Sequence, residues 1–293
     1  MNQLGLKVTA VYFSPTGGSR KYAEAISRGI DENFTVIDLT NRKNRNHTYV
    51  FGPDDLVVFS APVYAGRLPV LPESLFGNLE GNGAAAVISV TYGNREFDDA
   101  LLEMKDLCEQ AGFNCIGAAA LLAQHTYTDK LAGGRPDKED LEEAERFGRI
   151  VRELSEKQQN KDVGEMHSDR TEISRLSSDS KSSAELTLKK CLHSMDDIPG
   201  NRPYKESGRM PKHTETADFC SECGLCAKIC PVGAITYGAG MEADGELCIG
   251  CLSCVKNCPR GARFVKDPGL SKIREKLEPA FSGIYKENIY FID

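Results

Sequence analysis

The chain has 293 residues, of which 40% are hydrophobic and 27% charged, so its composition is that of an ordinary globular protein with room for about two domains. Its 43 acidic and 36 basic side chains give a net charge of −7, which argues against a nucleic-acid partner because phosphate binding needs a basic face. No apolar run approaches the ~18 residues of a membrane helix, and residues 1–13 do not have the pattern of a signal peptide. We therefore expect a cytoplasmic protein that makes no contact with a membrane.

The first half of the chain alternates between strand-like and helix-like patterns. Apolar, β-rich runs predict five strands, over residues 6–13, 35–39, 56–60, 84–90 and 115–122. Apolar residues at helical spacing predict helices over 18–31 and 97–111, and a long helix after Pro136 with Asp137 as its N-cap. This alternation indicates an α/β fold, in which a parallel sheet is covered on both faces.

The turn after the first predicted strand reads Ser14-Pro15-Thr16-Gly17-Gly18-Ser19 and leads straight into a helix. Backbone N–H groups at a helix N-terminus bind anions, the hydroxyl groups add neutral donors, and the two glycines allow a close approach. The turn has no Walker lysine and no G-x-G-x-x-G pattern, so a nucleoside triphosphate and a dinucleotide are disfavoured as ligands.

Residues 14–19 match the phosphate loop of the flavodoxin family, Ser/Thr-x-Thr-Gly-x-Ser/Thr, and roughly residues 4–155 resemble that family. The resemblance implies a flavodoxin-like, doubly wound, five-stranded parallel sheet of order 2-1-3-4-5 in a domain of residues 1–157. It also implies an FMN at the carboxyl ends of the strands, with Tyr64 and Tyr92 stacking on its ring because tryptophan is absent. The cofactor-binding residues implied in this way are Ser14, Thr16, Gly17, Gly18, Ser19, Pro62, Tyr64, Ala65, Gly66, Thr91, Tyr92, Gly93 and Asn94.

The segment 124–136 follows the fifth predicted strand and is longer than a simple strand-to-helix turn. His125 and Tyr127 in it are weak catalytic candidates, as proton donors to a reduced flavin or to a substrate. The alternative is a structural histidine in a polar loop.

We interpret residues 158–216 as a polar linker, because the segment is serine-rich and nearly devoid of aromatic residues. Near its end, Arg202, Lys205, Arg209 and Lys212 stand against a single acid, Glu206. One interpretation is a positive strap that lies against the acidic domain that follows or against a flavin phosphate. The other is a solvated run of charges.

Eight of the eleven cysteines form two copies of one pattern, C-x2-C-x2-C-x3-C-P, offset by 28 residues within 217–268. This spacing is typical of bacterial ferredoxins with two [4Fe–4S] clusters, in which the fourth cysteine of each run binds the other cluster. We therefore predict a small α+β two-cluster ferredoxin domain, followed by a C-terminal tail of residues 269–293. The predicted ligands are Cys220, Cys223, Cys226 and Cys258 for cluster one, and Cys248, Cys251, Cys254 and Cys230 for cluster two.

The whole chain resembles the fused flavodoxin–ferredoxin proteins of anaerobic bacteria and archaea, often called EFR1-type ferredoxins. Three hypotheses for its function follow. The first is an iron–sulfur flavoprotein that transfers electrons at low potential between the clusters and the FMN. The second is a flavin-dependent reductase of a small organic acceptor such as a quinone, and the third is a redox-sensing binding module with structural clusters. The partner is then a redox protein or a small electron acceptor, and the sequence leaves the oligomeric state open.

Overall fold

The computed structural model describes residues 5–76, 78–162, 192–207, 214–238, 241–266 and 268–293. Its main feature is a seven-stranded sheet in the order β2-β1-β4-β6-β7-β11-β8. The first five of these strands are parallel to one another, and they are β2 (Thr35–Asp38), β1 (Lys7–Tyr12), β4 (Asp55–Pro62), β6 (Ala85–Tyr92) and β7 (Asn114–Leu122). All five correspond to strands predicted from the sequence, and the doubly wound parallel sheet is confirmed.

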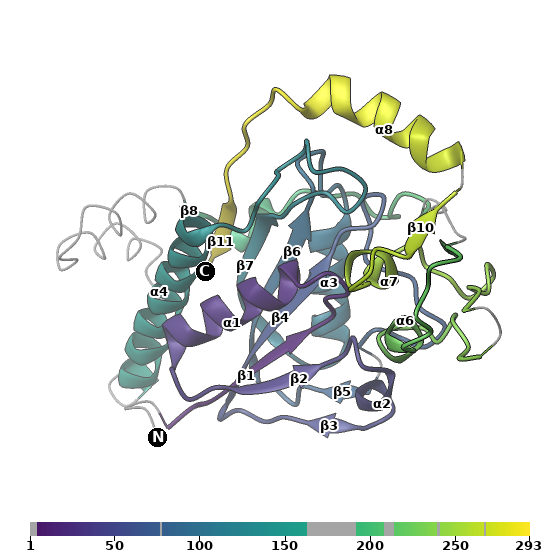
Figure 1. The fold of residues 1–293 in the computed structure, drawn as a ribbon. Helices are drawn as coiled ribbons and strands as arrows, with labels where there is room; N and C mark the ends of the chain where they lie inside the picture. Colours follow the sequence, from purple (N-terminus) through teal and green to yellow (C-terminus); the bar gives the residue numbers. More distant parts are fainter. Residues whose placement is uncertain (1–4, 77, 163–191, 208–213, 239–240, 267) are drawn as a thin grey trace.

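Helices cover both faces of the sheet (Figure 1). On one face, α1 (Gly18–Ile30) packs on β1 and β4 and α4 (Lys138–Asp162) packs beside α1 and on β7, while on the other face α3 (Ala100–Gln110) packs on β6 and β7. Val58 of β4 belongs to the apolar core of the first face and Phe59 to that of the second. Neighbouring residues of one strand thus point into opposite cores, which explains why these strands are continuous apolar runs. Glycines at positions 29 and 148 let α1 and α4 approach closely, because a Cβ at either would collide with the backbone of the other helix.

The predicted start of the long helix is confirmed by its capping contacts. The Asp137 side chain accepts the N–H of Asp140 at 3.0 Å, and the Asp140 side chain accepts the N–H of Asp137 at 3.0 Å. This reciprocal pair satisfies two donors that a helix N-terminus leaves free.

The five-stranded sheet expected from the sequence is extended to seven strands by distant parts of the chain. β11 (Ile289–Ile292) pairs antiparallel with β7, and β8 (Leu192–His193) pairs parallel with β11. The segments interpreted as a linker and a tail thus each contribute a strand. β11 is held because Tyr290, Phe291 and Ile292 are buried between the two cores.

Short elements complete the first half of the molecule. α2 (Arg42–Arg45) follows β2, β3 (Tyr49–Val50) pairs with β5 (Leu79–Glu80), and a 3-10 turn, η2 (Met195–Asp197), follows β8.

The cysteine-rich part contains two matching turns of helix, α6 (Leu225–Lys228) and α7 (Ser253–Lys256), which are 28 residues apart. β9 (Thr214–Thr216) pairs antiparallel with β10 (Arg263–Val265), a short strand that follows the second cysteine run. After the first run, the residues that the structure describes form an isolated bridge between Ile235 and Ala243. α8 (Pro268–Phe281) then crosses above the carboxyl ends of the large sheet, and the chain returns to β11 (Figure 1).

Candidate cofactor sites

A cavity of about 650 Å³ lies at the carboxyl ends of β1, β4, β6 and β7. Its walls come from the loops that follow these four strands, together with Lys205, Gly250 and Lys256 and with Ile273, Lys276 and Leu277 of α8. Ligands bind at this edge of doubly wound sheets, because the loops on either side diverge there. The cavity therefore lies where the sequence predicts a flavin, and it is closed partly by the cysteine-rich half of the chain.

The loop between β1 and α1 forms one end of the cavity, and its hydroxyl groups help to hold its shape. Ser14 Oγ accepts the N–H of Arg20 at 2.9 Å, and Ser19 Oγ lies 2.7 Å from Thr91 Oγ1. Gly17 adopts a left-handed conformation with φ of 91°, which favours glycine, although the residue itself does not line the cavity.

This loop also has the donors that a phosphate requires. No acceptor within the described parts of the chain binds the N–H groups of Thr16, Gly18 or Ser19. These groups lie at the positive end of the α1 dipole, and Lys21 lines the same end of the cavity. The loop therefore fits a terminal phosphate.

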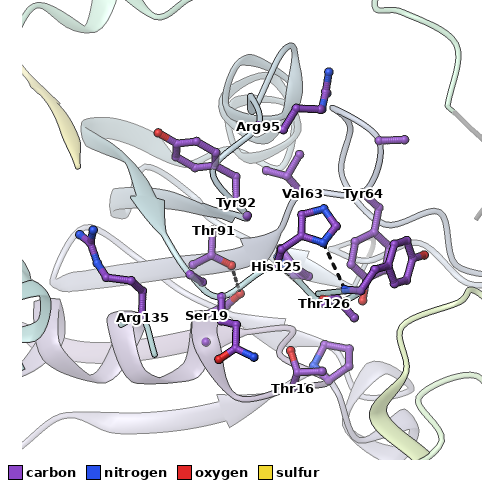
Figure 2. A pocket seen from close by; sticks show the side chains of 18 of the residues that line it. Thr16, Ser19, Val63, Tyr64, Thr91, Tyr92, Arg95, His125, Thr126 and Arg135 are labelled. Atoms are coloured by element: carbon purple, nitrogen blue, oxygen red, sulfur yellow. Dashed lines mark hydrogen bonds between the residues drawn. The ribbon is translucent and has the colours of Figure 1, made fainter. Parts of the chain in front are cut away.

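The loops after β4 and β6 form the sides of the cavity, and Figure 2 shows Tyr64 and Tyr92 on different walls. Tyr64 is partly buried, whereas Tyr92 is 4% exposed and packs edge-on against Phe97 with ring centroids 5.4 Å apart. Tyr64 is therefore the better placed of the two to stack on a planar ligand.

Most of the residues expected to bind the cofactor lie on the cavity wall. Besides Gly17, the exception is Asn94, whose Nδ2 donates to the carbonyl groups of Phe281 and Ile284 at 3.1 and 2.8 Å. Asn94 thus holds the end of α8 in place and does not face a ligand.

His125 lies inside the cavity, close to Val63 and Tyr64 (Figure 2). Its Nδ1 accepts the N–H of Tyr127 at 3.1 Å, so a neutral ring carries its proton on Nε2. Burial, and then the positive charges of Lys256 and Arg95, lower the pKa of His125 to about 4. At neutral pH the side chain is therefore a hydrogen-bond donor and not an acid, which argues against the expected role as a proton donor.

Tyr127 joins the two halves of the molecule. Its hydroxyl group donates to the carbonyl of Gly250 at 3.3 Å, and its ring packs with Leu252 and Leu270. Burial raises the pKa of Tyr127, and the nearby thiols of Cys251 and Cys248 raise it further. Tyr127 also lines the large cavity, so its hydrogen bond to Gly250 connects the second cysteine run with that cavity, and its role as a proton donor stays a prediction.

A second contact between the halves involves Arg45 of α2, which is 4% exposed. Its guanidinium donates to the carbonyl of Pro231, directly after Cys230, and lies 3.4 Å from Glu73. Sequence patterns did not single out this residue, because an arginine in a surface helix is usually solvated.

The eight cysteines of the two runs surround two separate cavities. The first cavity is lined by Cys220, Cys223, Cys226 and Cys258, and the second by Cys230, Cys248, Cys251 and Cys254. Each set thus contains three cysteines of one run and the last cysteine of the other, and the binding of one cluster by each set stays a prediction. No three metal-binding side chains in the described ranges converge on a point that could hold a single ion.

The surroundings of the thiols fit an iron–sulfur cluster. Ala234 N–H donates to Cys230 Sγ at 3.2 Å, and Ala262 N–H donates to Cys258 Sγ at 3.3 Å, so the same contact occurs in both repeats. Although burial raises it, the pKa of Cys258 is lowered overall by the backbone N–H groups of residues 260–263. Donors of this kind stabilise thiolates and bound clusters.

Part of the basic segment is held against the first half of the molecule. Arg202 pairs with Asp106 at 2.5 Å, and Lys205 pairs with Asp98 at 3.1 Å and also lines the large cavity. Both side chains are nevertheless exposed, so these two residues are solvated charges that pair with acids of the first half. Arg209 and Lys212 lie outside the described residues.

We refer to residues 268–293, comprising α8 and β11, as the C-terminal strap. Glu278 of α8 pairs with Lys130 at 2.8 Å and accepts a hydrogen bond from Thr128 at 2.7 Å, and Lys286 Nζ donates to the carbonyl of Arg95 at 2.5 Å. The strap is thus fastened to the loops after β6 and β7, and it covers the cavity that they form. The sequence contains no motif for this arrangement.

No helix in the described parts of the chain is long and apolar enough to span a membrane. A family model described as a 4Fe-4S dicluster domain matches residues 219–262. A search of curated proteins finds no match. The chain therefore carries a 4Fe–4S dicluster domain, joined to an N-terminal half with a flavodoxin-like sheet.

Three similar solved structures each cover about half of this chain. A flavodoxin from the domain Archaea is 18% identical with a TM-score of 0.36, over 52% of this chain and 99% of its own. A WrbA-like flavodoxin from Agrobacterium tumefaciens is 17% identical with a TM-score of 0.35, over 52% and 98%. An NAD(P)H:quinone oxidoreductase from Methanothermobacter marburgensis is 16% identical with a TM-score of 0.34, over 50% and 96%.

Proposed function

We propose that this protein is an iron–sulfur flavoprotein of the cytoplasm that transfers electrons at low potential between two [4Fe–4S] clusters and a bound FMN. The observation that carries the proposal is the shared cavity. Gly250, which lies between two predicted ligands of cluster two, lines the same cavity as the phosphate loop and Tyr64. A cluster held by Cys248 and Cys251 is therefore a direct neighbour of a ligand in that cavity.

The residues of the first half form the binding site for the flavin. The free N–H groups of the loop 14–19 bind its phosphate, Tyr64 stacks on its ring, and the Nε2–H of His125 donates to a ring or acceptor atom. When bound, the flavin exchanges one or two electrons with clusters that carry one each. The protein contributes by holding these groups close together and by excluding water with α8.

The positions of the cavities also suggest in which order electrons pass through the two clusters. Gly250, between Cys248 and Cys251 of cluster two, lines the flavin cavity, whereas none of residues 220–226, which supply three ligands of cluster one, lines it. Beside cluster one the exposed aromatic side chains Phe219 and Tyr237 reach solvent. We place the contact with a redox partner protein at cluster one, so that electrons pass between partner and flavin through both clusters.

A second candidate is a flavin-dependent reductase of a small acceptor, in which the clusters supply the electrons. The enclosure of the cavity by α8 favours it, because a simple electron carrier does not need a covered pocket beside its flavin. The neutral His125 would then donate a hydrogen bond to a carbonyl oxygen of the acceptor.

The test begins with the full-length protein purified without oxygen, in which iron, sulfide and flavin are counted per chain. A reductant is then added in steps while the flavin absorbance and the EPR signals of the clusters are recorded. We expect two cubanes and one FMN, with added electrons distributing among all three. Clusters that become reduced while a bound flavin stays oxidised would contradict the relay, and a protein without flavin would favour the binding-module alternative.

A further inference from the structure

Arg263 is a buried cation to which the described residues offer no counter-charge. The residue is 3% exposed and lies on β10, five positions after the predicted cluster ligand Cys258. In the described part of the chain no carboxylate pairs with it, and its Nε has no hydrogen-bond acceptor. A buried charge that is not neutralised is costly, so its presence indicates that a negative group is missing from its surroundings.

The two terminal nitrogens of Arg263 are held by neutral acceptors. Nη1 donates to Thr216 Oγ1 at 2.6 Å and to the carbonyl of Met241, and Nη2 donates to the carbonyl of Thr214 at 3.2 Å and to its hydroxyl group. These contacts fix the orientation of the guanidinium and leave Nε and the full positive charge available. The side chain is therefore both immobilised and electrostatically unsatisfied.

The missing negative group corresponds to cluster one. Arg263 lines the cavity formed by the four predicted ligands of this cluster, and its charge acts to lower the pKa of Cys226 against the effect of burial. A cubane with four thiolates carries a charge of roughly −2 when oxidised and −3 when reduced. An arginine at this position supplies the counter-charge, and its Nε–H supplies a donor.

The internal repeat provides a built-in comparison. The residue 28 positions before Arg263 is Ile235, which is buried and lines the cavity of cluster two. The last cysteine of each run otherwise has the same backbone contact, in which an alanine N–H four residues later donates to Sγ, at 3.2 Å for Cys230 and 3.3 Å for Cys258. At this position of the repeat, cluster one thus has a buried positive charge and cluster two an aliphatic side chain, whereas the buried Arg45 beside cluster two is paired with Glu73 at 3.4 Å.

We propose that Arg263 is the counter-charge of cluster one and makes this cluster the first to be reduced; the inference rests on the proposed two-cluster function. The step is the gain of one electron from the reductant, with no bond or proton exchanged. A fixed positive charge stabilises the more negative, reduced state and so raises the reduction potential. Cluster one then holds the first electron, while cluster two, next to the flavin, is the site of lower potential.

The test is a potentiometric titration of the full-length, cluster-loaded protein, followed by EPR. For Arg263→Met we expect the ratio of reduced to oxidised cluster one to fall at least tenfold at a given ambient potential, which is about 59 mV for one electron. Cluster two should be much less affected, and Arg263→Lys should recover part of the shift. The matched control is Arg260→Met, because Arg260 lines the same cavity but is exposed, so that water screens its charge.

Two results would overturn the inference. One is a titration in which Arg263→Met and Arg260→Met shift the reduction potential of cluster one equally, or in which neither variant shifts it. A difference in potential between the two clusters would then come from their different exposure to solvent. The other is a wild-type protein in which cluster two is reduced first. If Arg263→Met fails to assemble its clusters, the order is still decided by Arg263→Lys and by the wild type, with Cys258→Ser and Cys230→Ser identifying each signal. A wild-type protein without two cubanes would instead contradict the proposed function itself.

Discussion

The low pKa of His125 leads to a pH-dependent loss of stability. The folded protein holds this ring neutral with a pKa of about 4, whereas the unfolded chain titrates near the ordinary value of 6.5. As the pH falls below about 6.5 the unfolded state binds a proton first, so the free energy of unfolding decreases until the pH reaches about 4. By linkage the loss is about 2 kcal/mol between pH 8 and pH 5, and about 3 kcal/mol once both states are protonated.

The variant His125→Gln removes the titrating group. We expect the melting temperature of the wild type to fall by about 4–8 °C more than that of His125→Gln between pH 8 and pH 5, as 2 kcal/mol corresponds to such a shift in a protein of this size. The assay is thermal unfolding followed by circular dichroism under anaerobic conditions. His47→Gln is the matched control, because His47 is exposed on the surface.

The comparison between variants cancels the pH dependence of all other groups. If the melting temperatures of the wild type and of His125→Gln fell by the same amount between pH 8 and pH 5, the assignment of a neutral, buried His125 would be refuted. If His47→Gln reduced the pH dependence of the melting temperature as much as His125→Gln does, the effect would not be specific to the cavity.

Three further predictions concern the clusters, the phosphate loop and the strap. Cys258→Ser and Cys230→Ser should each lower the iron content from about eight to about four per chain. Each variant should also slow electron arrival at the flavin in stopped-flow absorbance with a protein electron donor, because electrons pass through both clusters, and an unchanged rate in either variant would contradict the relay. Gly17→Ala places a Cβ at φ of 91°, so we expect about tenfold weaker FMN binding in a fluorescence titration, and unchanged binding would contradict the role of the turn. Phe291→Ala in β11 should cost about 3–5 kcal/mol in the free energy of unfolding, whereas Tyr285→Ala, at a side chain that is 82% exposed, should cost below about 0.5; equal losses would mean that β11 is not part of the core.

The sequence by itself determined the elements whose signal is local. Each strand of the parallel sheet is an apolar run bounded by turn residues, and the Asp137 cap lies next to the helix that it begins. The same holds for the residues of the phosphate turn, whose hydroxyl groups and glycines follow directly after β1. The cysteine runs are also local patterns, because one thiolate every third residue can surround a cluster within a single turn of chain.

Only the tertiary structure decided how the two halves meet. The contacts from Tyr127 to Gly250, from Arg45 to Pro231 and from Asn94 to the end of α8 join residues more than a hundred positions apart. Such contacts leave no periodic pattern, since each depends on a single side chain meeting a backbone carbonyl. For the same reason no local pattern marks the four-residue β11 as a strand, because its burial depends on a sheet edge that the distant β7 provides.

The difference between the two cluster sites illustrates the same division. The repeat aligns Arg263 with Ile235 in the sequence, but an arginine near a cysteine run is by itself an ordinary surface residue. Folding buries its side chain between β9 and β10 and against the predicted ligands of cluster one, where no carboxylate in the described residues neutralises it. Its charge becomes significant only there, because water no longer screens it.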